Sequence, residues 1–412
     1  MANEILSSQR NALTYFDTTK DVFVDYTDAR TKKMTTQGIV SKFIRVESGQ
    51  NPRWGSTMDF EFGQSDSLGM IYAQTNIDVT SGANIPDHAG LRLLERVEFY
   101  WGANNLMSYD YKPTMQAIMS RLPTGQRELI LRSMRGGSPN GPPGAETLSD
   151  IITPIPFIFD RALLRGANEF ADLRNVSGRM RIRLTFSTAA KFYAGAPTTI
   201  PATFGQTALF YSSQVFSEDL RVGQAVPAQD LRRTLVFKSV DIQTLPAQDL
   251  LIGTQGETLI DVTSLAGPVR AYGVVVYDGT AAEVRDGIVA PTNTIYPDSI
   301  SLRVNGNKYY EINNGTESAR SLIKYQNYST GNSMSDEAYV AGVSASSAIT
   351  WLPLGVSQDD LRTFAGCLDT LSVNKVHLAI KNPNPTAVRA VAIVALIDTN
   401  YIISDRGFDK SS

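Results

Sequence analysis

The sequence contains one cysteine, Cys367, and two histidines, His88 and His377, among its 412 residues. A single thiol excludes a disulfide framework within the chain. Two histidines in opposite halves are a poor match for the clustered imidazole and carboxylate ligands of metal-dependent β-barrel enzymes. We therefore expect Cys367 to be a buried small hydrophobic residue and His377 to be an ordinary outward-facing strand residue.

Long hydrophobic runs are also missing. The longest, Ala390 to Ile397, has the length of one β-strand and falls short of the roughly 18 residues that a membrane-spanning helix requires. The first residues, MANEILSSQR, lack the apolar core of a secretory signal peptide. These absences predict a soluble protein that is made in a cytoplasm.

The chain carries no excess of positive charge. Lysine and arginine number 38 against 41 acidic residues, for a formal net charge of -3. A protein dedicated to nucleic acid needs a strong positive field, so we expect no specific nucleic-acid partner. Hydrophobic residues make up 42% and charged residues 19%, which is typical of a globular chain rather than a disordered one.

The dominant pattern is that of β-strands, with short apolar or alternating runs bounded by glycine, proline, asparagine and aspartate. In RMRIRLTF (179–186) apolar residues and arginines alternate, which predicts a strand buried on one face and exposes Arg179, Arg181 and Arg183. Asn305-Gly306 between two alternating runs predicts a tight hairpin. The predicted strands are 38–46, 57–63, 95–102, 179–187, 208–216, 232–243, 256–264, 270–279, 298–306, 307–313, 374–382 and 388–403.

Four other segments depart from the strand pattern. Apolar residues at helical spacing predict helices over 112–122 and 159–174. The glycine- and proline-rich segment 135–147 predicts a long exposed loop between them. Residues 217–233 are polar and lack alternation, which indicates a linker.

Three pairs of short segments suggest an internal repeat. VEFYWG at 97 resembles VVVYDG at 274, GRMRIRLTF at 178 resembles NKVHLAIKN at 374, and TMDFEF at 57 resembles TLIDVT at 258. The matches keep their order and are separated by about half the chain, as in a duplicated β domain; two unrelated β domains would also give some such matches. We predict an N-terminal arm (1–35), a first sandwich (36–216), a linker (217–233), a second sandwich (234–404) and a tail (405–412).

Signatures of catalysis are scarce. The sequence has no phosphate-binding loop, no dinucleotide fingerprint and no Gly-x-Ser-x-Gly elbow. Asp59 and Glu61 share a strand face and formally resemble a glycosidase pair, but a solvated outer face is the interpretation we favour. Asp359 and Asp360 are typical of the first turn of a helix. We predict no catalytic, cofactor-binding or metal-binding residue.

The segment AGLRLLERVEFYWGANNL (89–106) resembles a strand of the first barrel in the major capsid proteins of tectivirus-type, lipid-containing icosahedral viruses. GRMRIRLTF resembles the penultimate strand of that barrel, ALFYSSQVFSEDL (208–220) its last strand, and VRAYGVVVYDG (269–279) the corresponding strand of the second barrel. The chain differs from that family in its long insertions between strands. The positions that match in the first segment are Gly90, Leu94, Arg96, Val97, Phe99 and Tyr100.

The resemblance implies an all-β chain of two consecutive eight-stranded jelly-roll sandwiches, a double jelly roll, with a few short helices in loops. It implies a structural major capsid protein without enzyme activity or cofactor: a homotrimeric, pseudo-hexagonal capsomer that tiles the icosahedral shell of a virion. The implied partners are other copies of the chain, penton and minor capsid proteins, and an internal lipid membrane reached through the N-terminal arm.

Two alternatives stay open. One is a carbohydrate-binding or carbohydrate-active β-sandwich protein, which would use exposed aromatic residues and paired carboxylates. The other is an adhesin or appendage subunit, against which the missing signal peptide counts. For the arm, we expect that it is dispensable for folding but needed for shell assembly, because its few apolar residues would be buried only against a neighbour or lipid.

Overall fold

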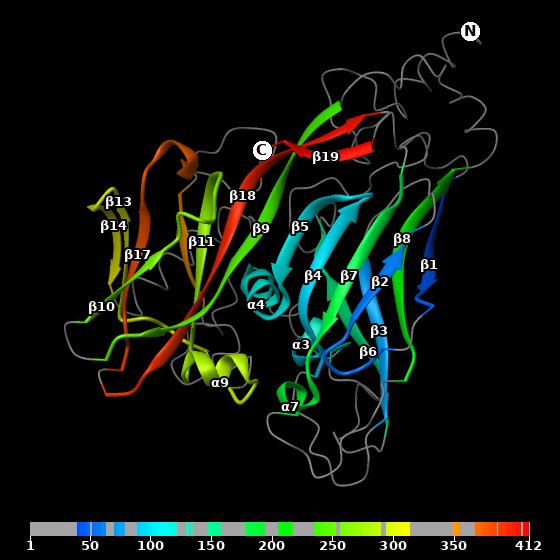
Figure 1. The fold of residues 1–412 in the computed structure, drawn as a ribbon, viewed down its shortest axis with the longest axis horizontal. Coiled ribbons are helices and arrows are strands. Elements are labelled where there is room, and N and C mark those ends of the chain that lie inside the picture. Colours follow the sequence, from blue (N-terminus) through cyan, green and yellow to red (C-terminus); the bar gives the residue numbers. More distant parts are fainter. Residues whose placement is uncertain are drawn as a thin grey trace.

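The computed structural model places the chain largely in antiparallel β-sheets (Figure 1). The predicted arm, the linker 217–233, the predicted helix 159–174 and nearly all of the loop 135–147 lie outside the described residues. The structure describes residues 39–49, 52–62, 70–78, 89–121, 129–131, 133–134, 147–157, 178–193, 205–216, 235–252, 256–289, 294–313, 349–354, 367–384, 386–404 and 407–411.

Eight strands in the N-terminal half form two four-stranded sheets, with orders β1-β8-β3-β6 and β2-β7-β4-β5. Counted along the chain, the orders are first-eighth-third-sixth and second-seventh-fourth-fifth, the arrangement of a jelly roll. The strands are β1 (Ile39–Glu47), β2 (Thr57–Glu61), β3 (Ile71–Asp78), β4 (Leu94–Trp101), β5 (Asn104–Asp110), β6 (Thr147–Ile155), β7 (Met180–Phe186) and β8 (Thr207–Phe216).

The C-terminal half repeats this arrangement, with sheets β9-β18-β11-β15 and β10-β17-β13-β14. Its main strands are β9 (Leu235–Leu250), β10 (Glu257–Asp261), β11 (Pro268–Tyr277), β13 (Ser299–Val304), β14 (Asn307–Asn313), β15 (Ile349–Pro353), β17 (Val376–Lys381) and β18 (Arg389–Ser404). Three short strands extend the first of these sheets: β12 (Thr294–Ile295), β16 (Leu368–Asp369) and β19 (Gly407–Ser411).

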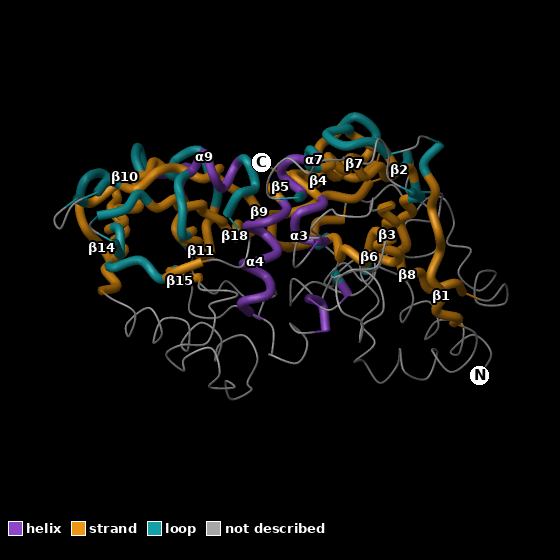
Figure 2. Tube along the Cα trace, turned by 90° about the horizontal axis from the view of Figure 1, so that it is seen from below, coloured by secondary structure: helices purple, strands orange, loops and turns teal. Residues whose placement is uncertain are grey.

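The described helices are short and lie in the connections between strands (Figure 2). The central one, α4, runs between the two groups of strands in both views (Figures 1 and 2). The helices are α3 (Ala89–Leu93), α4 (Tyr111–Arg121), α7 (Ala189–Phe192), α9 (Ala281–Arg285) and the 3₁₀ helix η3 (Thr370–Ser372).

Local sequence explains β7 and the β13–β14 hairpin. Burial along β7 alternates residue by residue, with the apolar side chains in the first core and the arginines outside. At the hairpin, Asn305 (φ 51°) and Gly306 (φ 85°) both adopt positive φ. Asparagine and glycine are the residues that tolerate this conformation, so the predicted tight turn forms there.

In the sheet β9-β18-β11-β15, the central strands β18 and β11 are buried on both faces. Val274 and Ile393 point into the core of the second sandwich. Their neighbours in sequence, Val275 and Val394, point the other way and join the hydrophobic core of the first sandwich. Continuous apolar runs such as Ala390 to Ile397 follow from this, because no position of the strand faces water.

The predicted fold class is confirmed, and every predicted strand is present; the bounds agree within a few residues except for β9, which ends seven residues beyond the predicted 243. The predicted helix 112–122 corresponds to α4. Seven strands were missed: β3, β5, β6 and β15, and the short strands β12, β16 and β19. The sequence of β3 does alternate between apolar and polar residues, and its apolar Ile71, Ala73 and Ile77 point inward. The strand β5 begins with two asparagines, which mark turns more often than strands.

The internal repeat holds for two of its three matches. The segments at 57 and 258 fall on the second strand of each sandwich, and those at 178 and 374 on the seventh. The third match pairs β4, a fourth strand, with β11, a third strand, so it is wrong. Likewise 269–279 is not the last strand of its sandwich, which is β18. The predicted tail contains β19.

Candidate functional site: the seam between the sandwiches

The face with Asp59 is an ion-pair network rather than a catalytic pair. Arg183 donates two hydrogen bonds to the Asp59 carboxylate, at 2.8 and 3.2 Å, and Arg181 lies 3.5 Å from it. The hydrogen bonds from Arg183 hold the pKa of Asp59 below its usual value. A carboxyl group held ionised in this way is unsuited to act as the general acid of a glycosidase.

The rest of this face is neutralised within its own sheet. Arg179 lies 3.6 Å from the Glu61 carboxylate, and both side chains are well exposed. The guanidinium groups of Arg181 and Arg183 lie 4.8 and 5.3 Å from the centre of the Tyr100 ring. The arginine row is therefore paired with acidic and aromatic neighbours, in agreement with its predicted outward orientation.

The other residues that Sequence analysis considered for a site do not lie together. His377 points outward between the buried Val376 and Leu378, as expected. Cys367 is half-buried rather than buried, and burial raises the pKa of its thiol. His88, Asp359 and Asp360 lie outside the described residues. Within the described part of the chain, no three metal-ligating side chains gather and no helix is long and apolar enough to cross a membrane.

The two sandwiches are joined by a buried contact, which we call the seam. Its centre is α4 of the first sandwich, which packs against β18, β11, β15 and β9 of the second. The small residues Ala271 and Ala392 line this face of the sheet, and the Trp351 ring lies over Gly273. At the centre, the buried Tyr277 hydroxyl donates a hydrogen bond to Gln116 Oε1 at 2.7 Å.

One end of the seam is closed by Arg92 of α3. This side chain is 4% exposed and donates to the carbonyl of Gly287 in the second sandwich at 2.6 Å and to that of Lys191 in the first at 3.4 Å. Gly287 has φ +77°, and a Cβ there would lie 2.4 Å from the Lys191 carbonyl oxygen. Only glycine allows the two backbones to approach this closely.

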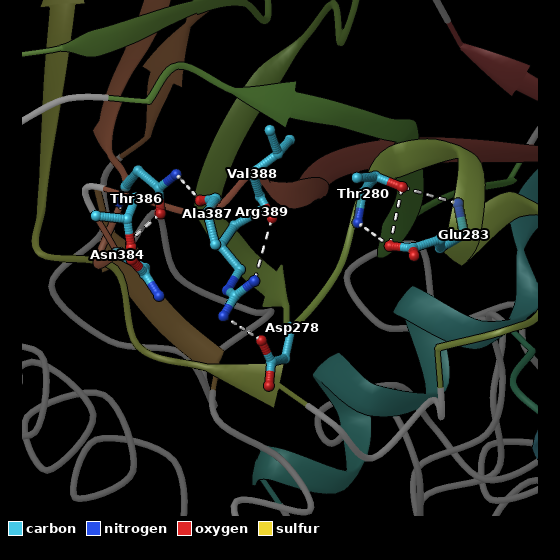
Figure 3. Close-up of polar contacts among 9 residues, drawn as sticks. Asp278, Thr280, Glu283, Asn384, Thr386, Ala387, Val388 and Arg389 are labelled. Atoms are coloured by element: carbon cyan, nitrogen blue, oxygen red, sulfur yellow. Dashed lines mark hydrogen bonds and ion pairs between the residues drawn. The ribbon is translucent and has the colours of Figure 1, made fainter.

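Local hydrogen bonds hold α9, which precedes Gly287, in place. Thr280 and Glu283 form a capping box at its start (Figure 3). The Ala281 N–H donates to Asp249 Oδ1 of β9 at 2.6 Å. Beside the helix, Arg389 of β18 pairs with Asp278 at 2.5 Å (Figure 3). The second sandwich therefore presents Gly287 from a fixed support.

The other end of the seam contains a polar cavity of about 540 Å³ between β5 and β9. Asp241, which is 2% exposed, pairs there with Lys410 of β19 and accepts a hydrogen bond from Gln243 at 3.0 Å. Burial raises the pKa of Asp241 despite the lysine. Across the cavity, the Asp110 N–H donates to Thr244 Oγ1 at 3.0 Å. The C-terminal strand β19 also contacts β4 and β5, so it helps to join the two sandwiches.

Sequence analysis did not identify the seam. Arg92 and Gly287 are 195 residues apart, and neither belongs to a recognisable motif. The one available signal was the unbroken apolar character of β11 and β18. Such runs indicate burial on both faces, but they do not tell which element covers the second face.

No protein-family model matches the chain, and the search of curated proteins found no match. The search of solved structures did find similar folds. A chain of the PBCV-1 virus capsid has a TM-score of 0.67 at 12% identity, covering 91% of this chain and 97% of that one. This chain is a double jelly roll.

Two further solved structures share the double jelly roll. The Faustovirus major capsid protein has a TM-score of 0.57 at 10% identity, covering 98% of this chain and 99% of its own. A chain of the Sputnik virophage has a TM-score of 0.54 at 12% identity, covering 91% and 88%. At these identities the likeness establishes the fold of the chain.

Proposed function

We propose that this double jelly roll is a major capsid protein, the repeating structural unit of an icosahedral virus shell. The observation that carries the proposal is the seam: two sandwiches of identical strand order are locked into one rigid body by buried contacts. Three such chains would supply six similar sandwiches around one axis. A pseudo-hexagonal unit of this kind tiles a closed shell.

The wider assembly is part of the same proposal. The arm (1–35) would contact neighbouring capsomers or an internal lipid membrane, and penton and minor capsid proteins would fill positions where six sandwiches do not fit. The division into a first sandwich (36–216), linker (217–233) and second sandwich (234–404) is proposed with it. Because the chain would act by packing, it would need neither cofactor nor catalytic residue.

The test is the native mass of the purified protein by light scattering, together with negative-stain microscopy. We expect a particle of three times the 45.0 kDa chain mass, with a hexagonal outline. A stable monomer or dimer at high concentration would contradict the proposal. Turnover of a glycan that a single point substitution abolishes would also overturn it, in favour of the carbohydrate-active alternative.

The arm is tested with a chain that begins at Thr36, which keeps all of β1. We expect this chain to form trimers of normal thermal stability, because the core and seam residues in the described part of the chain all come after Thr36. We expect it not to close shells under conditions in which the full chain does. Loss of trimers would place the arm in the core of the capsomer, and normal shells would remove its proposed role.

A further inference from the structure

Each sandwich contains one sheet made of its first, eighth, third and sixth strands. In the second sandwich, the outer face of that sheet is covered by the first sandwich, through α4, with β5 packed against β9 at its margin. In the first sandwich, the equivalent sheet β1-β8-β3-β6 lies at the far end of the molecule (Figures 1 and 2). The outer face of β1-β8-β3-β6 is therefore equivalent to the covered face of the second sandwich but is not part of the seam.

That face carries exposed aromatic side chains. Phe43 of β1 is 55% exposed and contacts the ring of Tyr72 edge-on, with 5.8 Å between ring centres. Tyr72 stacks on Phe210 of β8, with 5.1 Å between ring centres and 8° between ring planes. Met70, at 37% exposure, lies beside them just before β3. We call these four residues the aromatic patch.

The patch has the composition of a protein interface rather than of a solvated sheet. An ion pair of Arg45 and Glu47, 2.8 Å apart, borders it along β1. Aromatic and methionine side chains at the centre with charged residues at the rim are typical of protein–protein contacts. The outer face of the sheet β2-β7-β4-β5 carries instead the paired arginines and carboxylates already described.

The seam indicates what would cover the patch. Along the seam, β5, which is the fifth strand of the first sandwich, lies against β9, which is the first strand of the second sandwich. The fifth strand of the second sandwich is β14, which is the edge strand of its sheet among the described strands. Leu106, the third residue of β5, is 1% exposed in the seam; the third residue of β14, Tyr309, is 69% exposed. This edge thus has an exposed aromatic residue where β5 has a buried leucine.

We propose that the aromatic patch of one chain binds the β14 edge of a second copy of this chain, with Tyr309 packed against Phe43. The contact repeats between chains the arrangement that the seam makes within one chain, and it rests on the proposed function. Patch and edge lie at opposite ends of the molecule (Figure 1). A head-to-tail contact closes into a ring when the rotation between neighbouring copies closes, and the proposed pseudo-hexagon corresponds to a ring of three chains.

The first experiment compares Phe43→Asp and Tyr309→Asp with the matched control Leu371→Asp. All three residues are exposed, Leu371 at 67%, so each variant should fold with an unchanged melting temperature. By light scattering we expect the control to remain trimeric and both test variants to become monomeric. The milder Phe43→Ala should weaken association about 30-fold, as expected for an aromatic residue at the centre of an interface.

Mixing the two monomeric variants tests the head-to-tail geometry. Phe43→Asp keeps an intact β14 edge, and Tyr309→Asp keeps an intact aromatic patch. The mixture should form a one-to-one heterodimer that cannot close into a ring, whereas each variant alone stays monomeric. A mixture that remains monomeric at concentrations where wild type is fully trimeric contradicts the proposed pairing.

The outcomes separate this inference from the proposed function. If the wild-type chain is monomeric, the proposed function fails and the inference fails with it. If wild type is trimeric and either test variant is also trimeric, the inference is wrong and the proposed function stands. Trimers that persist in Phe43→Asp but no longer form shells would assign the patch to contacts between capsomers.

Discussion

The two sheets made of first, eighth, third and sixth strands have the same strand order, and their outer faces differ in how far they are covered. In the second sandwich the outer face is buried, with small and aliphatic residues such as Ala271 and Val394 beside the aromatic Tyr277 and Trp351. In the first sandwich it carries Phe43 and Arg45, both exposed. The same strand order therefore occurs once with a buried outer face and once with an exposed outer face. The residues on each outer face differ accordingly.

The comparison shows where stability and where association are expected to reside. Substitutions on the covered face change the free energy of unfolding of a single chain, because the contacts they remove are made within that chain. Substitutions on the open face leave that free energy nearly unchanged and act on binding between chains. The predictions below test this division, from the largest expected effect to the smallest.

Gly287→Ala in the seam should lower the free energy of unfolding more than the other substitutions. The new Cβ would collide with the Lys191 backbone at 2.4 Å, and φ +77° strains any side chain, so we expect a loss of about 3 kcal/mol. Urea denaturation followed by tryptophan fluorescence measures it. The control is Gly306→Ala, which has φ +85° but no atom within 4 Å, and should lose about 1 kcal/mol. Equal losses would mean that the close approach does not matter.

Tyr277→Phe removes the hydrogen bond to Gln116 at the centre of the seam. Because both groups are buried, we expect the free energy of unfolding to fall by about 1–2 kcal/mol. The matched change on the open face, Tyr72→Phe, should cost less than about 0.5 kcal/mol. If the two variants unfold at the same urea concentration, the distinction between covered and open faces would lose its energetic basis.

Lys112→Met tests a partly buried charge beside the seam at the start of α4. Burial, aided by Arg92, lowers the pKa of Lys112 from its usual value of 10.5 to about 8. Between pH 8 and pH 10.5 the folded state therefore binds fewer protons than the unfolded state. The charged Lys112 lowers the free energy of unfolding below this range, and that loss disappears as pH rises from about 8 to 10.5.

We expect Lys112→Met to raise the free energy of unfolding at pH 7 by on the order of 1 kcal/mol. The advantage over wild type should shrink as pH approaches 10.5. Lys375→Met, at an exposed lysine, provides the control and should show no such pH dependence. An advantage that is constant with pH would show that packing, rather than desolvation of the charge, causes it.

Asp59→Asn on the exposed face of β2 should have the smallest effect. The ion pairs with Arg183 and Arg181 are partly exposed, so we expect a loss below about 1 kcal/mol that decreases with added salt. Because the folded-state pKa of Asp59 is depressed, its contribution is present above pH 3.8 and disappears as pH falls through the folded value. A larger loss that salt does not change would point to burial in an interface.

Local patterns predicted most strands because they record how many faces of a strand are buried. Alternation in β7 placed its arginines outside, and Asn305-Gly306 located a hairpin. The same reasoning missed β5, whose opening asparagines suggest a turn, and it aligned β4 with β11 because two strands of similar composition can occupy different places in a sheet. Composition describes a strand's surroundings and does not describe its position in the strand order.

The sequence by itself determined that the chain is all-β, where most of its strands lie, and that Ala390 to Ile397 is an unbroken apolar run of strand length. Only the tertiary structure decided that this run is buried on both faces, that α4 covers one of them, that Arg92 and Gly287 meet, and that Phe43 is exposed. The physical reason is the distance along the chain over which each effect acts. Periodicity and turn chemistry act within a few residues, whereas the partner of a buried face is selected by packing between segments that are distant in the chain.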